Sequence, residues 1–339
     1  MAACPQTQSE LLTRLLRDVS RSFYLTLRVL PAAVRAQIGL AYLLARTADT
    51  IADTKIVPVA TRLQALRQLR QRMLGEEGGR LDFGDLARHQ GLPAERVLLD
   101  RCEESLAILG ALSPGDAQQV RTVLATITGG QELDLQRFAD ASAERILALQ
   151  TDAELEDYTY RVAGCVGEFW TRMCRTHLFP NTPLDDARLL ADGVRFGKGL
   201  QLVNILRDLP ADLRQGRCYL PAEKLASVGL QPADLLHPAN ELKLRPLFDG
   251  YLDQAQAHLA AGWAYTNILP RGQVRVRLAC AWPILIGVRT LERLRTARVL
   301  DATLRVKVSR AEVRRIVGRS VWLYPCRGAW ARQFQGRSN

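Results

Sequence analysis

The sequence predicts an all-α protein: one helical domain whose helices surround a central cavity. Apolar residues recur at the helical period, and the stripe after Pro31 contains Val34, Ile38, Ala41, Ala45, Ala48 and Ala52. Runs of β-branched residues in strict alternation, which indicate strands, are nearly absent. Turn signals separate the long helical patterns, and no linker of biased composition divides the chain.

The helical period recurs in order along the chain, and each pattern predicts one helix. The expected helices cover residues 9–19, 34–52, 59–74, 93–110, 116–138, 142–150, 153–177, 184–208, 245–268, 273–299 and 309–320. Turns are expected at residues 75–79, 113–115, 180–183 and 270–272, where Gly, Pro, Ser and Asn gather. Pro210 should kink or end its helix. We expect one domain over residues 1–320 and a basic aromatic tail over residues 321–339.

Composition excludes several classes of protein. The chain has 339 residues, 47% hydrophobic and 24% charged, which is ordinary for a globular protein and too apolar for a disordered one. Its seven cysteines form no CxxC pair, which argues against a disulfide framework and a structural zinc site and favours reduced thiols. The longest apolar run, residues 278–288, is too short to span a bilayer.

Charge is concentrated at the C-terminal end of the chain. Residues 241–339 contain 18 Lys and Arg against 6 Asp and Glu, within a total net charge of +11. Such a surface suits an anionic membrane, a diphosphate or a nucleic acid, and the alternative is a solvated arginine-rich face. No nucleic-acid-binding motif accompanies the charge, so we expect no nucleic-acid partner.

Two polar stripes interrupt the apolar helices. Tyr42, Arg46, Asp49 and Asp53 are spaced by four, three and four residues, so they share one helix face. Carboxylates four residues apart on a helix repel each other, and a divalent cation removes that cost. Mg²⁺ binds one or two carboxylates and completes its coordination with water and substrate phosphates. The stripe therefore predicts a magnesium site, although a single DxxxD pattern is more often a solvated face.

The second stripe repeats this arrangement with Gln201, Asn204, Asp208 and Asp212. If the two aspartate pairs face each other, they can hold a metal cluster, and the cluster can hold a diphosphate. Arg46, Arg207 and Arg217 would neutralise the remaining phosphate charge.

Four segments that contain these stripes resemble the squalene/phytoene synthase family, the head-to-head prenyl synthases. They are SRSF (residues 20–23), ARTADTIAD (45–53), YTYRVAGCVG (158–167) and QLVNILRD (201–208). The resemblance covers roughly residues 10–320 and implies the all-α isoprenoid synthase fold. Thr50 follows Asp49 where phytoene synthases usually carry a second Asp. The chain is therefore more similar to a bacterial-type squalene synthase without a C-terminal membrane span.

The resemblance implies an enzyme that condenses two farnesyl diphosphates to presqualene diphosphate with Mg²⁺ and then reduces it with NADPH to squalene. A phytoene or dehydrosqualene synthase, or a presqualene diphosphate synthase without reduction, remains an alternative. An alternative from another class is a catalytically inactive assembly factor of the same fold, although four unpaired aspartates on apolar helices argue against it.

The resemblance also assigns roles to residues. Tyr158 would be the base, and Asp49, Asp53, Asp208 and Asp212 would hold the metal. The substrate would contact Ser20, Arg21, Ser22, Phe23, Tyr42, Arg46, Val162, Val166, Gln201, Asn204, Arg207, Arg217 and Pro283. No GxGxxG motif follows a strand, so NADPH would not bind a Rossmann unit. The resemblance instead implies contacts of NADPH with Arg21, Arg46, Lys307 and Arg310. Glu168 receives no role beyond a salt bridge with Arg172.

The location follows from the absence of a membrane span and from the tail. We expect a cytoplasmic monomer, peripheral to the inner face of the membrane. Arginine alternates with aromatic residues in the tail, a composition found at headgroup level: Arg319, Trp322, Tyr324, Arg327, Trp330, Arg332, Phe334 and Arg337. The alternative is a disordered tail with no membrane role.

Overall fold

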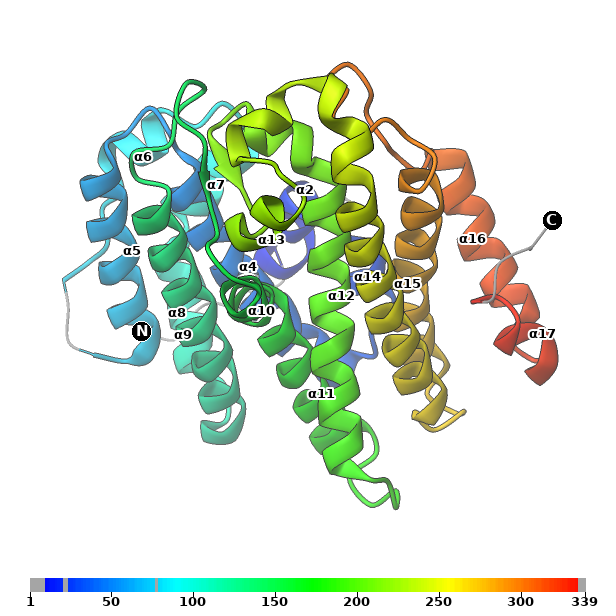
Figure 1. Cartoon of the computed structure of the whole chain (residues 1–339). Coiled ribbons are helices and arrows are strands. Elements are labelled where there is room, and N and C mark those ends of the chain that lie inside the picture. Colours follow the sequence, from blue (N-terminus) through cyan, green and yellow to red (C-terminus); the bar gives the residue numbers. More distant parts are fainter. Residues whose placement is uncertain (1–9, 21–23, 77–78, 335–339) are drawn as a thin grey trace. The chain divides into compact units, whose positions relative to one another are not determined.

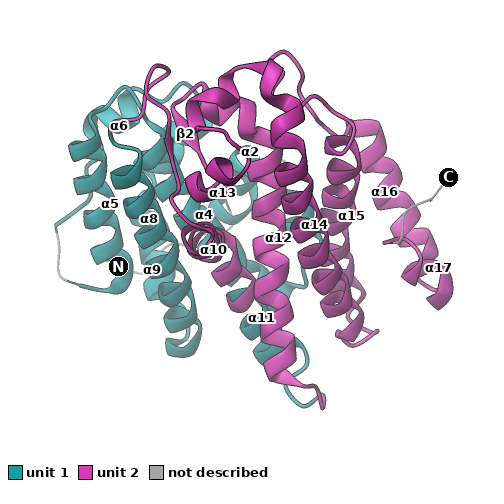
Figure 2. Ribbon diagram, viewed as in Figure 1, with its two compact units in different colours: residues 1–139, 169–181 teal, residues 140–168, 182–339 magenta. Residues whose placement is uncertain are grey.

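Helices form nearly all of the regular structure in the computed structural model of the protein, which describes residues 10–20, 24–76 and 79–334 (Figure 1). The strands of this described part are only two residues long. The predicted all-α class is therefore confirmed. Contacts between Cα atoms divide the chain into two compact units: unit 1 has residues 1–139 and 169–181, and unit 2 has residues 140–168 and 182–339 (Figure 2).

Unit 1 is organised around one long helix, α4, which packs against α5, α8 and α9. The elements of unit 1 are η1 (Leu11–Leu15), α2 (Leu16–Val19), α3 (Tyr24–Val29), α4 (Ala32–Asp53), α5 (Val59–Leu74), α6 (Gly84–Arg88), α7 (Pro93–Asp100), α8 (Cys102–Gly110) and α9 (Pro114–Arg137). Residues 169–178 of α11 (Cys165–Leu178) also belong to it. The predicted apolar stripe of residues 34–52 lies within α4, as the helical period requires.

Local signals set the ends of these helices. Pro31 immediately precedes α4, and its ψ of 148° is extended rather than helical. The Ser113 hydroxyl accepts a hydrogen bond of 3.2 Å from the backbone N–H of Asp116 at the start of α9. Gly75 ends α5 with a φ of 84°, a left-handed conformation that glycine adopts without steric cost.

Unit 2 is organised around α12, which packs against α14, α15 and η3. The elements of unit 2 are β1 (Leu147–Ala148), α10 (Asp152–Thr159), η3 (Tyr160–Gly164), the first four residues of α11, α12 (Asp186–Leu213), β2 (Arg217–Cys218), α13 (Ala222–Ser227), η4 (Pro232–Leu236), η5 (Pro238–Asn240), α14 (Glu241–Ile268), α15 (Val274–Leu294), α16 (Arg310–Leu323) and α17 (Arg327–Ala331). α12 continues through Pro210 to Leu213, so of the two predicted effects of this proline, the end of the helix is excluded, and a kink stays a prediction. Proline removes one N–H donor, and the neighbouring turns keep the helix intact.

Glycines allow η3 and the start of α11 to cross α12 at backbone contact. A Cβ atom added to Gly167 would lie 1.9 Å from the carbonyl oxygen of Gly193 on α12. A Cβ atom added to Gly197 of α12 would lie 2.0 Å from the carbonyl oxygen of Ala163. No side chain fits at these distances, so only glycine permits this crossing. The crossing gives a structural reason for the glycines of the segment YTYRVAGCVG.

The helix predicted at residues 142–150 is wrong. The Ser142 hydroxyl accepts hydrogen bonds from the backbone N–H groups of Glu144 and Arg145, at 3.2 and 3.1 Å, and these bonds form a turn instead of a helix. The following residues form β1, which pairs in parallel with β2. The predicted helix of residues 93–110 is divided at Arg101, whose φ of −101° and ψ of 17° leave the helical region. The apolar period continues through this break, so the pattern does not reveal it.

The C-terminal residues pack within unit 2 as an aromatic cluster. Trp330 of α17 is 3% exposed and stacks on Trp263 of α14, with ring centroids 5.2 Å apart. Phe334 stacks on the same indole at 6.0 Å, and Tyr324 meets Trp330 edge to face at 4.9 Å. The guanidinium of Arg277 lies 5.6 Å from the ring centres of both Tyr324 and Trp330. The expectation that Trp330 and Tyr324 lie at headgroup level is therefore wrong, because this cluster holds both rings.

α16 crosses the predicted boundary at residue 320, so residues 321–323 complete a helix. The division into a domain of residues 1–320 and a tail stays a prediction. No helix of the described residues has the length and apolar character that crossing a membrane requires.

The glycine crossing predicts a large and local sensitivity to substitution. Gly167→Ala and Gly197→Ala should each lower the free energy of unfolding by at least ~2 kcal/mol, because the added methyl group would overlap a backbone carbonyl. Urea denaturation followed by circular dichroism measures the change.

The matched control is Gly250→Ala in α14, where an added Cβ meets no atom within 4 Å. This substitution should be neutral or stabilise the protein by up to ~1 kcal/mol, since alanine favours helices. Equal effects at Gly250 and Gly167 would contradict the crossing.

Candidate active site

The first predicted polar stripe lies on α4 in unit 1. Tyr42, Arg46 and Asp49 are half-buried and Asp53 is exposed, whereas the positions beside them on α4 are buried. The Arg46 guanidinium donates a hydrogen bond to Glu95 of α7 and lies 3.9 Å from the Asp49 carboxylate. The predicted alignment of these four side chains on one helix face is present.

The Asp49 carboxylate carries an electrostatic cost. Desolvation by the surrounding protein and repulsion from Asp53 raise the pKa of Asp49 from 3.8 to about 6, against the attraction of Arg46. Its side chain is 48% exposed, so solvent screens part of this cost. The pair thus has more negative charge than its surroundings compensate, which suits a bound cation.

Two residues that the sequence did not indicate support this stripe. Gln131 of α9 is 8% exposed, and its side-chain amide donates a hydrogen bond to Asp49 Oδ1. Glu95 accepts the hydrogen bond from Arg46 and is also half-buried. The sequence holds only a weak indication of Gln131, namely a polar residue on a largely apolar helix face.

The second predicted stripe lies on α12 in unit 2. Gln201, Asn204, Asp208 and Asp212 are half-buried between buried leucine, isoleucine and valine positions. The Arg207 guanidinium donates two hydrogen bonds to the Asp208 carboxylate, at 2.9 and 2.5 Å. The side-chain amide of Asn204 donates to Gln201 over 3.4 Å. One carboxylate of this pair is therefore already paired with an arginine.

Tyr158 lies at the end of α10 and stacks on Tyr219, with ring centroids 4.6 Å apart. Tyr219 follows β2, the strand that contains Arg217. The stack thus brings Tyr158 next to the segment of Arg217. The predicted apolar residues Val162 of η3, Val166 of α11 and Pro283 of α15 are all half-buried within unit 2.

Polar contacts fix the π-helical turn η3 next to Tyr158. The Tyr160 hydroxyl donates a hydrogen bond of 3.2 Å to Glu168, which gives this carboxylate a structural role that the sequence did not assign. The Lys198 ammonium lies 5.6 Å from the centre of the Tyr160 ring and also binds Glu156 of α10. Lysine, tyrosine and two carboxylates therefore connect α10, η3, α11 and α12.

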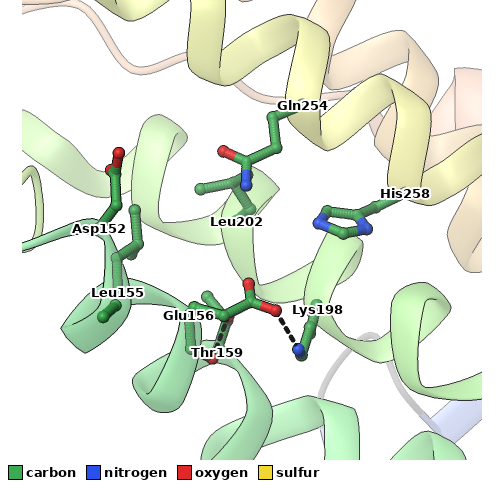
Figure 3. Close-up of a pocket in the computed structure, with 9 residues that line it drawn as sticks. Asp152, Leu155, Glu156, Thr159, Lys198, Leu202, Gln254 and His258 are labelled. Atoms are coloured by element: carbon green, nitrogen blue, oxygen red, sulfur yellow. Dashed lines mark hydrogen bonds and ion pairs between the residues drawn. The ribbon is translucent and has the colours of Figure 1, made fainter.

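A cavity of about 350 Å³ opens beside this network within unit 2 (Figure 3). Its lining comes from α10, α12 and α14: Asp152, Ala153, Leu155, Glu156, Thr159, Lys198, Leu202, Gln254 and His258. Glu156 and Lys198 point toward each other across one side of it. None of the aspartates and arginines predicted to hold metal and diphosphate lines this cavity, although Leu202, next to Gln201 of the second stripe, does.

The remaining predicted residues lie apart from these clusters. Ser20 follows α2, is 2% exposed, and its hydroxyl donates to the carbonyl of Leu16. Arg21, Ser22 and Phe23 lie outside the described residues. Lys307 and Arg310 are exposed at the start of α16. The carboxylate of Glu312 already caps the N-terminus of this helix by accepting from the backbone N–H of Ser309 at 3.0 Å.

The donor set fits a magnesium ion that shares its coordination with substrate. No group of three or more Asp, Glu, His or Cys gathers among the residues that the structure describes, so neither stripe forms a closed protein cage. Each stripe offers two carboxylates, and Mg²⁺ characteristically uses one or two together with water and phosphate oxygens. For NADPH the fit is partial, because Arg46 is engaged with Glu95 and only the side chains of Lys307 and Arg310 are exposed.

Comparisons with known proteins agree on one family. The sequence profile of the family described as Squalene/phytoene synthase matches residues 16–312. A presqualene diphosphate synthase of Rhodopseudomonas palustris is 31% identical over 254 residues, which are 75% of this chain and 77% of that protein. A 15-cis-phytoene synthase of Synechocystis sp. is 28% identical over 284 residues, 81% of this chain and 72% of that protein. The solved structure of TcSQS with the ligand BPH1237 has a TM-score of 0.76 at 20% identity and covers 98% of this chain and 93% of that one.

The raised pKa of Asp49 predicts a pH-dependent stabilisation by Asp49→Asn. Above pH 6 the ionised carboxylate destabilises the fold, whereas below pH 4 it is protonated in both folded and unfolded chains. The isosteric amide should therefore raise the melting temperature by about 2 °C at pH 8 and leave it unchanged near pH 4. Differential scanning calorimetry without metal measures both values.

The control is Asp140→Asn, an aspartate whose side chain is 74% exposed and which should show no such gain. A melting temperature that falls at pH 8, or rises equally at both pH values, would show that Asp49 is not under electrostatic strain.

Proposed function

Since the chain belongs to the squalene/phytoene synthase family, whose members are prenyltransferases, we propose that it condenses two farnesyl diphosphates head to head to presqualene diphosphate. The observation that carries this proposal is the aspartate pair on one face of each of the two helices α4 and α12. The pKa of the Asp49 carboxylate is raised to about 6 by desolvation and by Asp53, and such a carboxylate suits a magnesium diphosphate. The isoprenoid synthase fold, predicted from the sequence, is the fold of the solved relative.

In the proposed site, the aspartates Asp49, Asp53, Asp208 and Asp212 hold Mg²⁺. The bound ion supplies Lewis-acid stabilisation of the leaving diphosphate. Arg207 and Arg217 on α12 and β2 would bind phosphate oxygens, and the planar guanidinium suits this task. Gln131 holds the Asp49 carboxylate in one orientation, and Glu95 does the same for Arg46.

The hydrocarbon half of the reaction needs a dry pocket and a base. Val162, Val166 and Pro283 would shield the allylic cation from water. Attack by the second prenyl double bond and loss of one proton close the cyclopropane ring, and one diphosphate and one proton leave. Tyr158 would accept or relay this proton, and its stack on Tyr219 fixes the ring while the hydroxyl moves the proton.

We propose reduction to squalene as the second stage, with NADPH bound through Arg21, Arg46, Lys307 and Arg310. The residues fit this cofactor only in part, so we assign no step to it. The names of the relatives differ on the product: one is a presqualene diphosphate synthase and another a 15-cis-phytoene synthase. We also propose a location at the inner face of the cytoplasmic membrane.

Product analysis tests the reaction. Incubation of the protein with farnesyl diphosphate and Mg²⁺ should yield presqualene diphosphate, and addition of NADPH should convert the output to squalene. Gas chromatography with mass spectrometry after phosphatase treatment identifies both. An identical mixture with and without NADPH would remove the reductive stage and leave the condensation.

The absence of any coupled product from farnesyl diphosphate would contradict the proposed condensation. A parallel assay with geranylgeranyl diphosphate tests the phytoene synthase alternative, which the similarity to the Synechocystis protein supports. If only geranylgeranyl diphosphate is coupled, the substrate of this protein is the longer prenyl diphosphate.

A further inference from the structure

Helix α16 presents an outer face of which the proposed reaction uses only Arg310. In Figure 1, α16 lies beside α15 near the C-terminus, and contacts between the two helices confirm this. Val313, Ile316, Val317 and Ser320 face inward, and the Ser320 hydroxyl accepts a hydrogen bond of 2.8 Å from the indole of Trp282 on α15. At about 100° per residue, the exposed positions share the opposite half of the helix. This outer face consists of Arg310, Ala311, Arg314, Arg315, Gly318, Arg319, Val321 and Trp322.

Charge on the outer face is arranged along two edges. The helical period places Arg310 and Arg314 along one edge and Arg315 and Arg319 along the other. The positions between these edges are held by small or apolar residues: Ala311, Gly318 and Trp322. A face that is apolar in its centre and basic at both edges is typical of a helix that lies in a lipid headgroup layer.

No described acidic side chain neutralises these arginines. The only acidic residue of α16, Glu312, accepts two hydrogen bonds from Arg293, at 2.6 and 2.7 Å, and one from the backbone of Ser309. Within the described part of the chain, the four arginines of the outer face form no ion pair. The face therefore has four positive charges and no negative one.

Trp322 is the one tryptophan of this chain that is exposed to solvent. Its relative exposure is 79%, whereas Trp170, Trp263, Trp282 and Trp330 lie between 3% and 8%. Its neighbour Val321 is 50% exposed. The exposure of so much indole surface is unfavourable in water, and an indole ring is favourably placed among lipid headgroups.

Tyr324 and Trp330, which follow α16, fix the orientation of this helix. The Tyr324 hydroxyl donates a hydrogen bond of 2.6 Å to the carbonyl of Arg271, and the Trp330 indole donates one of 2.7 Å to Asn267. These bonds hold the C-terminal end of α16 on the helices beneath it. The outer face is thus preformed, and its ordering costs little on binding.

We propose that the outer face of α16 docks the protein on an anionic membrane, with Trp322 at headgroup depth between the two arginine edges. Charge complementarity selects the lipid surface, because four unpaired cations attract anionic headgroups. A second copy of the chain is a poor partner, since an isologous contact would bring the same arginines together. Arg315, Arg319 and Trp322 have no role in the proposed reaction, so a test at these residues can fail while the proposed reaction stands.

Vesicle flotation of the full-length protein tests the proposal. At low salt, wild type should float with vesicles of phosphatidylcholine and 30% phosphatidylglycerol and should not float with vesicles of pure phosphatidylcholine. In 0.5 M salt it should not float with the mixed vesicles either, because salt shortens the screening length (about 3 Å at 1 M). The double variant Arg315→Gln/Arg319→Gln and the single variant Trp322→Ala should each reduce the partition coefficient at least ~10-fold. Tryptophan emission should shift to the blue on vesicle addition, and this shift should be lost in Trp322→Phe.

The matched control is Arg88→Gln/Arg96→Gln in unit 1, which removes the same charge from side chains that are 69% and 60% exposed. It should float like wild type, and circular dichroism should show that every variant is folded. Point variants are used because a deletion of residues 321–339 would also remove the buried Trp330. No flotation of wild type at low salt would overturn the proposal. Equal losses of flotation in the control and in the α16 variants would also overturn it. The same holds if the protein binds single-stranded DNA but does not float with vesicles.

Discussion

The backbone contact between η3, the start of α11 and α12 is the constraint on which the rest of unit 2 depends. Gly167 and Gly197 each leave no room for a side chain, because an added Cβ would overlap a carbonyl oxygen of the other segment. This contact sets the distance of Tyr158, just before η3, from the polar stripe of α12. The Tyr160–Glu168 hydrogen bond closes the π-helical turn between them. A contact this close fixes η3, and with it the proposed base Tyr158, against α12 without help from a ligand.

Periodicity predicted the fold class and most helices because tertiary packing follows the apolar stripe of each helix. It failed where local hydrogen bonds decide the conformation. Ser142 binds the next backbone N–H groups and starts a turn, although residues 142–150 have a helical pattern. Pro210 was expected to kink or end α12, and the helix does not end there, because one missing hydrogen bond does not outweigh the buried leucines on either side. The tail was interpreted from composition alone, which does not distinguish the buried Trp330 from the exposed Trp322.

The candidate site was predicted where its residues share one helix and missed where they come from different helices. Spacing in the sequence identifies the stripes of Asp49 and Asp208, since residues three or four apart share a face. It does not identify Gln131, which lies on α9 and binds Asp49 only in the folded unit. The two stripes also differ in a way that spacing cannot show. The Asp208 carboxylate has Arg207 as its partner, whereas desolvation and Asp53 leave the Asp49 carboxylate with a raised pKa.

The central proposal is that the aspartates of each stripe bind the magnesium ions of the diphosphate substrate, and the most direct test is turnover as a function of Mg²⁺ concentration. Release of diphosphate from farnesyl diphosphate should require Mg²⁺ and stop with EDTA. Asp49→Asn and Asp208→Asn should each lower the rate at least ~10²-fold at saturating metal, because each removes a metal ligand. The exposed Asp140→Asn serves as the control and should turn over at the wild-type rate. Near-normal rates in both stripe variants, or undiminished turnover in EDTA, would contradict the account.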